Sequence, residues 1–174
     1  MARVGDFVQV YSGRAFYPMD PRVEDITIED IAHSLSMRCR FGGHCTRFYS
    51  VAEHSVLVSD YVEPQHALWG LLHDAAEAYS CDVPHPLKRM LPQWVPMERK
   101  IMDAVCEAFG LDPVEPDNVV YTDWALLHDE KIALINPSYE SWGDLPPPLG
   151  AKIVGYEPEV AKNMFLDRFY ELAA

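Results

Sequence analysis

The stretch GLLHDAAEAY, residues 70–79, places a histidine, an aspartate and a glutamate in an otherwise apolar, alanine-rich segment. Its leucines and alanines are typical of a helix that packs in a protein core. An unpaired carboxylate is costly on buried surface, so these polar residues need partners or a cation. On one continuous helix over residues 65–80, His66, Gly70, His73 and Glu77 share a face, and Asp74 lies about 100° round from His73.

The rest of the chain predicts an all-α fold, a compact bundle of six or seven helices. Thr27 before Asp30 and Ser50 before Glu53 are typical helix starts. Proline opens and glycine or proline closes most of the remaining helices. The expected helical segments are 27–39, 50–62, 65–80, a short one after 82, 96–109, 116–136 and 158–172. A short hairpin is expected within residues 7–17.

We expect a single domain over residues 1–174. Its core motifs span 27–136, a proline-rich irregular loop follows over 137–157, and a C-terminal helix covers 158–172. A loop of that length often covers a site or forms an interface.

Composition narrows the class of protein. Of the 174 residues, 49% are hydrophobic and 24% are charged, as in ordinary globular domains. The net charge of −13 disfavours binding to a nucleic acid backbone. There is neither an apolar run of the roughly 20 residues that a bilayer requires nor a secretory signal at the start. The four cysteines form no zinc-binding pattern. We therefore expect a cytoplasmic protein with no membrane or nucleic acid partner.

Ionisable residues also lie on apolar faces of two other predicted helices. His54 shares its face with Leu57 and Val58, and Asp123 lies among valines and leucines of the helix over 116–136. Singly, each has a structural explanation, such as a hydrogen-bonded core histidine or a capping aspartate. Together, His54, His73, Asp74 and Asp123 make a suitable ligand set for one divalent ion. The ion stays open among Mn²⁺, Co²⁺, Fe²⁺, Ni²⁺, Zn²⁺ and Mg²⁺, and further ions could accompany a substrate's phosphates.

A histidine, an adjacent His-Asp pair and a later aspartate form the pattern of the HD-domain metal-dependent phosphohydrolases, which this chain resembles. YSVAEHS around His54, LLHDAAEAY around His73 and DVPHPLK at 82–88 are similar to small bacterial 5′-deoxynucleotidases and phage dATP triphosphohydrolases. IEDIAHSLSMRCRFGGHCTRFYSVAEHS is similar to the phage enzymes. The resemblance covers residues 27–136 and implies an HD-domain bundle.

The resemblance also implies roles for individual residues. The metal ligands would be His54, His73, Asp74 and Asp123. Glu77 matches the acid that orients or deprotonates the attacking water, and Asp82 a second acid that supports catalysis. Substrate contacts would come from Arg40, Phe41, Pro86 and Lys88, with Arg40 and Lys88 near the phosphates and Pro86 on the base. Phe41 stands where deoxynucleotidases have a tryptophan that helps reject a ribose 2′-hydroxyl.

The leading functional hypothesis is release of triphosphate from a deoxynucleoside triphosphate, most of all dATP. The alternative is removal of phosphate from deoxynucleoside monophosphates, and a more distant one is hydrolysis of an alarmone or cyclic nucleotide. A binding module with a structural metal is the non-enzymatic hypothesis, but it predicts an incomplete catalytic set. By analogy, we expect a homo-oligomer, either a dimer or a hexamer, in the cytoplasm, or in the host cytoplasm for a phage protein.

Other features carry weaker interpretations. His44 in the RFGGH loop is either a phosphate donor or a surface residue. The second His-Asp pair, His128-Asp129, is expected on a solvated helix face. The tryptophans are expected in the core or at an interface rather than stacked on a base, and His85 is not expected to be a ligand.

Overall fold

The computed structural model describes residues 2–174, which form an all-α bundle with a short N-terminal hairpin, as predicted. The helices and strands of this part of the chain are β1 (Val8–Gln9), β2 (Ala15–Phe16), α1 (Ile28–Met37), α2 (Val51–Tyr61), α3 (Ala67–Leu72), α4 (Glu77–Ser80), α5 (His85–Lys88), α6 (Trp94–Phe109), α7 (Asp117–Leu134) and α8 (Pro158–Leu172). Three short 3-10 helices are η1 (Val23–Asp25), η2 (Phe41–Gly43) and η3 (Pro64–His66). The seven predicted helices are all present, but the one expected over 65–80 is divided into η3, α3 and α4.

The helix ends follow from local chemistry. The side chain of Thr27 accepts a hydrogen bond from the backbone N–H of Asp30, and the Ser50 hydroxyl accepts one from Glu53 at 3.1 Å. Both predicted N-caps are thereby confirmed. Gly110 ends α6 in the left-handed conformation, which glycine adopts without steric cost. α6 begins at Trp94 rather than at Pro96.

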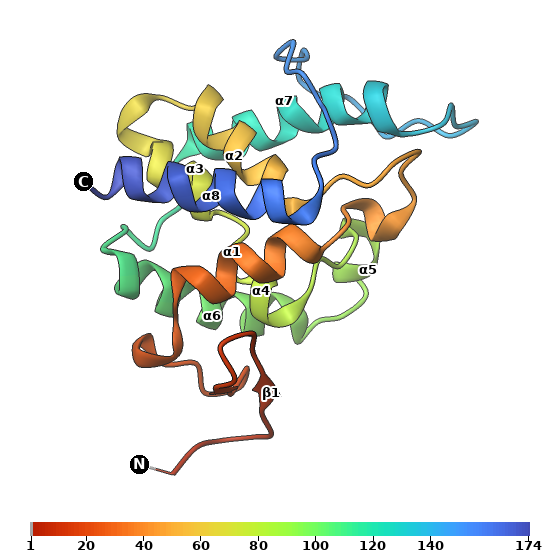
Figure 1. Ribbon diagram of the computed structural model, residues 1–174. Coiled ribbons are helices and arrows are strands. Elements are labelled where there is room, and N and C mark those ends of the chain that lie inside the picture. The colour runs from red at the N-terminus through yellow and green to blue at the C-terminus, as the bar shows by residue number, and fades with distance from the viewer. Residues whose placement is uncertain (1) are drawn as a thin grey trace.

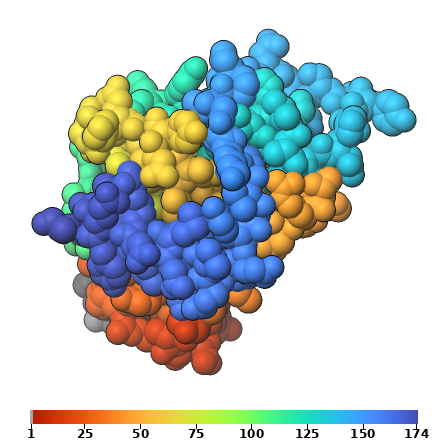
Figure 2. All heavy atoms as spheres, turned by 45° about the horizontal axis from the view of Figure 1, so that its top comes forward, coloured from red at the N-terminus to blue at the C-terminus, as the bar shows by residue number. Residues whose placement is uncertain are grey.

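The C-terminal helix α8 lies across the bundle. It packs against α1, α2 and α3, and Figure 1 shows it running between α1 on one side and α2 and α3 on the other. Phe165 of α8 is fully buried among core residues that include Leu35 of α1 and Leu71 of α3. Figure 2 shows the C-terminal segment, in blue, bordering the gold and yellow surface formed by the segment around α2 and α3. Within residues 2–174, no helix combines the length and apolar character needed to cross a bilayer.

The loop over residues 137–157 has no regular structure, as predicted, but its end is anchored to α2. Glu53, only 1% exposed, accepts hydrogen bonds from the backbone N–H groups of Val154, Gly155 and Tyr156 at 2.7–3.1 Å. Gly155 has a φ of 81°, and a Cβ there would lie 2.5 Å from the carbonyl oxygen of Phe48. This contact, which we call the Glu53 clamp, anchors the end of the loop to α2.

The same loop overturns the expectation for His128 and Asp129. Asp129 is buried and accepts hydrogen bonds from the backbone N–H groups of Leu149 at 2.7 Å and Gly150 at 3.0 Å. The Nδ1 of His128 bonds to the carbonyl of Pro146 at 2.8 Å. The predicted solvated face is therefore wrong, because residues 146–150 fold back onto α7 and cover it.

Candidate metal centre

The close packing of α2 and α3 brings His54 and His73 together. Gly70 of α3 faces Ser59 of α2, and a Cβ on Gly70 would lie 3.2 Å from the Ser59 Cα. Any larger residue at this position would push the two helices apart. The α2–α3 crossing therefore depends on a glycine three residues before His73.

The chain departs from a regular α-helix where the site residues lie. Between α3 and α4, backbone N–H groups bond three residues back, from Ala75 to Leu72 and from Glu77 to Asp74, each at 2.9 Å. Such tightened turns within a helical stretch often mark functional positions. His66, predicted on the face of His73, instead bonds through Nδ1 to the side-chain oxygen of Asn118 at 2.6 Å.

Three side chains from three segments direct metal-binding atoms at one point. The Nε2 of His54 lies 3.0 Å from Oδ1 of Asp123 and 3.2 Å from Nε2 of His73, and the His73 Nε2 lies 3.9 Å from Oδ1 of Asp123. Around an ion with bonds of about 2.1 Å, neighbouring ligand atoms lie about 3.0–3.4 Å apart and opposite ones about 4.2 Å apart. His54, His73 and Asp123 could therefore hold one metal ion.

Asp74, the fourth predicted ligand, borders this cluster. Its Oδ2 lies 3.3 Å from Nε2 of His73, 3.8 Å from Nε2 of His54 and 3.5 Å from Nη1 of Arg40. The carboxylate thus stands between the two imidazoles and a guanidinium.

Both imidazoles are fixed in the orientation that presents Nε2. The Nδ1 of His73 bonds to the carbonyl oxygen of Gly70 at 2.8 Å, and that of His54 bonds to Oε1 of Glu130 at 2.6 Å. A carbonyl and an ionised carboxylate only accept hydrogen bonds, so each Nδ1 carries the proton. When such a ring is neutral, as it must be to bind a metal, its lone pair lies on Nε2, toward the cluster.

The electrostatics of the cluster favour added positive charge. Burial alone would lower the pKa of His73, but the neighbouring Asp74 and Asp123 carboxylates raise it to about 10. Burial would raise the pKa of Asp74 and Asp123, yet the two histidines hold both below their usual range. Such a site stabilises a proton strongly, and a divalent cation would meet the same field.

Glu77 begins α4, three residues after Asp74, and keeps one unused oxygen. Its side chain is buried, Oε1 accepts a hydrogen bond from Nζ of Lys88 at 3.1 Å, and Oε2 has no partner among the described residues. Burial and the nearby Asp74 and Asp82 carboxylates raise the pKa of Glu77 well above its usual value, against the opposing effect of Lys88. A buried carboxylate oxygen without a partner is rare and is a candidate proton acceptor.

The two predicted phosphate-binding cations are both paired with carboxylates. Lys88 lies between Glu77 and Glu98, with Nζ 2.9 Å from Oε1 of Glu98. Arg40 donates from Nε and Nη2 to Glu130 at 3.2 and 2.9 Å, which leaves Nη1 on the side of Asp74. Arg40 thus contacts Asp74, a predicted metal ligand, directly.

Backbone strain occurs in the two loops that carry Arg40 and Asp82. Within residues 2–174, the non-glycine residues with positive φ are Phe41, at 57°, and Cys81, at 116°. Such conformations cost about 1–3 kcal/mol each and concentrate at functional sites. Asp82 is half-buried, and burial followed by the charge of Asp74 raises its pKa despite the opposing Arg40.

The remaining predicted substrate residues lie at the solvent side. The Phe41 ring centroid lies 5.4 Å from the Arg40 guanidinium carbon and 6.0 Å from the Trp142 ring centroid. Pro86 and His44 are exposed. Trp69 is buried, as expected for a core residue, whereas Trp142 is exposed.

Comparison with known proteins gives a family but no activity. No protein-family model matches the chain. The chain is 41% identical over 170 residues to the uncharacterized protein YfdR of Escherichia coli K12, and the alignment covers 96% of each protein. This chain belongs to the YfdR family. The uncharacterized protein RCAP_rcc00048 of Rhodobacter capsulatus is 37% identical over 118 residues, which cover 62% of this chain and 60% of the relative.

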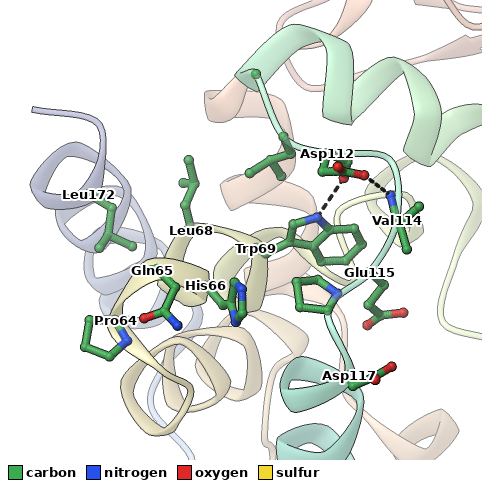
Figure 3. Close-up of a pocket in the computed structure, with 13 residues that line it drawn as sticks. Pro64, Gln65, His66, Leu68, Trp69, Asp112, Val114, Glu115, Asp117 and Leu172 are labelled. Atoms are coloured by element: carbon green, nitrogen blue, oxygen red, sulfur yellow. Dashed lines mark hydrogen bonds between the residues drawn. The ribbon is translucent and has the colours of Figure 1, made fainter.

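This YfdR-family chain also has a cavity of about 710 Å³ beside the N-terminal end of α7, at the start of α3. Figure 3 shows Trp69 within it, with the indole N–H donating to the carbonyl of Asp112, and the carboxylates of Glu115 and Asp117 on its wall. His66 is the one lining side chain that can carry positive charge. Because acidic walls repel phosphate, and because none of the predicted site residues lines it, this cavity is not a phosphate site.

Sequence reasoning missed Glu130 of α7, which is fully buried and contacts His54, Arg40 and Tyr49. From sequence alone, a single glutamate on a long helix is expected to face solvent. The available signal was its spacing of seven residues from Asp123, which places both on one helix face.

Proposed function

We propose that this YfdR-family chain is a metal-dependent phosphohydrolase of deoxynucleotides. The observation that carries the proposal is the convergence of His54, His73 and Asp123, and it is supported by Glu77, whose buried Oε2 has no partner among the described residues. The resemblance of its motifs to the HD-domain phosphohydrolases supports the same reading. A purely structural metal site would have no need of an unpaired acid.

In this proposal His54, His73 and Asp123 hold one divalent ion, and Asp74 is the fourth ligand. The two imidazoles are oriented by groups outside the cluster, so their ligand atoms are preorganised. A divalent ion would supply a Lewis acid for a phosphoryl oxygen and make a water molecule a stronger nucleophile near neutral pH.

Glu77 would take the proton of that water. Its Oε1 is held by Lys88, which leaves Oε2 as the accepting atom. A carboxylate with a raised pKa holds a proton more firmly near neutral pH than an ordinary glutamate does, and this suits a general base. Asp82 would assist from the edge of the site.

Arg40 would bind the phosphate. Glu130 holds its Nε and Nη2, so Nη1 beside Asp74 is the group left to donate to a phosphoryl oxygen. Phe41 follows Arg40 and would contact the sugar, and the exposed Pro86 would contact the base. Without an indole N–H, Phe41 would favour deoxyribose by shape alone.

We place dATP first among substrates, with deoxynucleoside and triphosphate as products. One observation favours the second candidate, a deoxynucleoside monophosphate. Arg40 and Lys88 are already paired with carboxylates, and the chain carries a net charge of −13. A triphosphate would therefore depend on further metal ions to balance its charge.

The test is a product assay with the purified full chain, Co²⁺ or Mn²⁺, and a panel of dNTPs, dNMPs and their ribose forms. Chromatography that separates phosphate, pyrophosphate and triphosphate distinguishes the two candidates. Glu77→Gln should abolish turnover while metal stays bound. Glu98→Gln is the matched control, because it removes the other carboxylate from Lys88 without altering Glu77. No hydrolysis of any nucleotide with any of the metals would refute the proposal.

A further inference from the structure

Glu130 is a carboxylate with no exposed surface that is saturated by contacts. Its Oε1 accepts from Nδ1 of His54 at 2.6 Å and from the hydroxyl of Tyr49 at 2.8 Å. Its Oε2 accepts from Nη2 of Arg40 at 2.9 Å and Nε at 3.2 Å. One buried side chain thus connects a candidate metal ligand to the candidate phosphate-binding arginine.

Glu130 makes more contacts than are needed to neutralise the charge of Arg40. The shortest contact of Glu130 is to His54, on the ring edge opposite the Nε2 that faces Asp123. An ionised carboxylate at Nδ1 keeps the proton there and increases the basicity of Nε2. α7 supplies both acids: Asp123 contacts the Nε2 edge of the His54 ring, and Glu130 contacts its Nδ1 edge.

The second carboxylate oxygen has a parallel effect on Arg40. By binding Nε and Nη2 together, it fixes the guanidinium plane and leaves Nη1 3.5 Å from Oδ2 of Asp74. Two-pronged pairing of this kind removes rotational freedom from the arginine. The Nη1 edge of Arg40 then faces Asp74 at the border of the metal cluster.

We propose that Glu130 is a positioning residue that couples the metal site to the phosphate site, by setting the His54 proton on Nδ1 and by orienting Arg40. The first part concerns the metal cluster alone. The second part rests on the proposed phosphohydrolase function.

Glu130→Gln is the informative variant because it preserves size and removes charge. Its amide has one accepting oxygen, so the NH₂ group must face either His54 or Arg40. Facing Arg40, it would oppose the donors Nε and Nη2, so it should face His54; Nδ1 then accepts and the proton moves to Nε2, where it blocks a metal ligand. Loss of such a supporting group lowers metal affinity by about 10- to 100-fold.

The experiment is calorimetric titration of the full chain with Co²⁺ alone. Glu130→Gln should weaken binding by about 10- to 100-fold, and Glu130→Asp, which retains the charge, should weaken it less. Two controls should stay near the wild-type affinity. Tyr49→Phe removes another hydrogen bond to the same carboxylate, and Glu53→Gln neutralises a different buried carboxylate on α2.

Each outcome decides the matter. Unchanged Co²⁺ affinity in Glu130→Gln overturns the proposal, as does equal weakening in the destabilised Glu53→Gln control. Circular dichroism establishes folding; if Glu130→Gln does not fold, unchanged affinity in Glu130→Asp overturns the proposal and weakened affinity supports it. Absence of Co²⁺ binding to the wild-type chain overturns it as well.

Activity separates this proposal from the proposed function. If Glu130→Gln weakens Co²⁺ binding but the wild-type chain hydrolyses no nucleotide, the metal part stands and the phosphohydrolase assignment fails. If hydrolysis occurs, Glu130→Gln at saturating Co²⁺ should raise KM for the nucleotide, whereas Tyr49→Phe should not. An unchanged KM would refute the coupling to Arg40.

Discussion

Replacing Glu53 by glutamine should destabilise the fold without altering the candidate metal centre. Oε1 of Glu53 accepts from Val154 and Gly155, and Oε2 accepts from Gly155 and Tyr156. A glutamine retains one of these accepting oxygens and turns its NH₂ group toward the other N–H groups. The Glu53 clamp thereby loses its charge and at least one backbone hydrogen bond.

The expected loss follows from those contacts. A hydrogen bond to a charged group contributes about 1.5–3 kcal/mol, and a buried N–H without a partner costs about 1–3 kcal/mol. The free energy of unfolding should therefore fall by about 2–4 kcal/mol. Since domains are stable by about 5–15 kcal/mol, the variant should remain folded.

Urea denaturation followed by circular dichroism measures this loss. The midpoint should fall while the slope of the transition stays constant, because the surface exposed on unfolding is unchanged. Glu107→Gln, on the exposed face of α6, is the matched control and should change stability by less than about 0.5 kcal/mol. A loss below about 1 kcal/mol in Glu53→Gln would refute the view that this buried carboxylate anchors the loop.

Three further predictions concern the loop and the site. Gly155→Ala should lower the free energy of unfolding, measured by urea denaturation, by about 2–4 kcal/mol. The left-handed backbone costs an alanine about 1–2 kcal/mol, and its Cβ would clash with the Phe48 carbonyl oxygen. An unchanged free energy of unfolding would contradict this close approach. Glu77→Gln should lower kcat by about 10²- to 10⁴-fold with Co²⁺ still bound, and a normal kcat would exclude Glu77 as the base. Co²⁺ at one hundred times its Kd should raise the free energy of unfolding by about 2.7 kcal/mol, measured by denaturation, and an equal gain in His73→Ala would place the ion elsewhere.

Most of the helix boundaries could be predicted from residues that are neighbours in the sequence. Thr27 and Ser50 were predicted as N-caps from residues three positions away, and Gly110 as the end of a helix, because capping depends on neighbours in sequence. The break between α3 and α4 was not predicted. The apolar pattern of residues 67–79 continues through it, and no glycine or proline marks it.

The sequence predicts part of the site but not the buried acids that support it. His54, His73 and Asp123 were predicted together because ionisable residues are conspicuous on apolar faces, and the structure brings them together. Glu130 and Asp129 were not distinguished from solvated helix residues. Their burial is decided by segments far away in sequence, the residues around Arg40 and the loop that returns over α7.

Anomalous diffraction from crystals of the wild-type chain grown with Co²⁺ tests the central claim most directly. We expect one strong peak about 2.1 Å from the Nε2 atoms of His54 and His73, with Asp123 and Asp74 carboxylate oxygens completing the site. A peak elsewhere, or none between these side chains, would contradict a metal centre built by His54, His73 and Asp123.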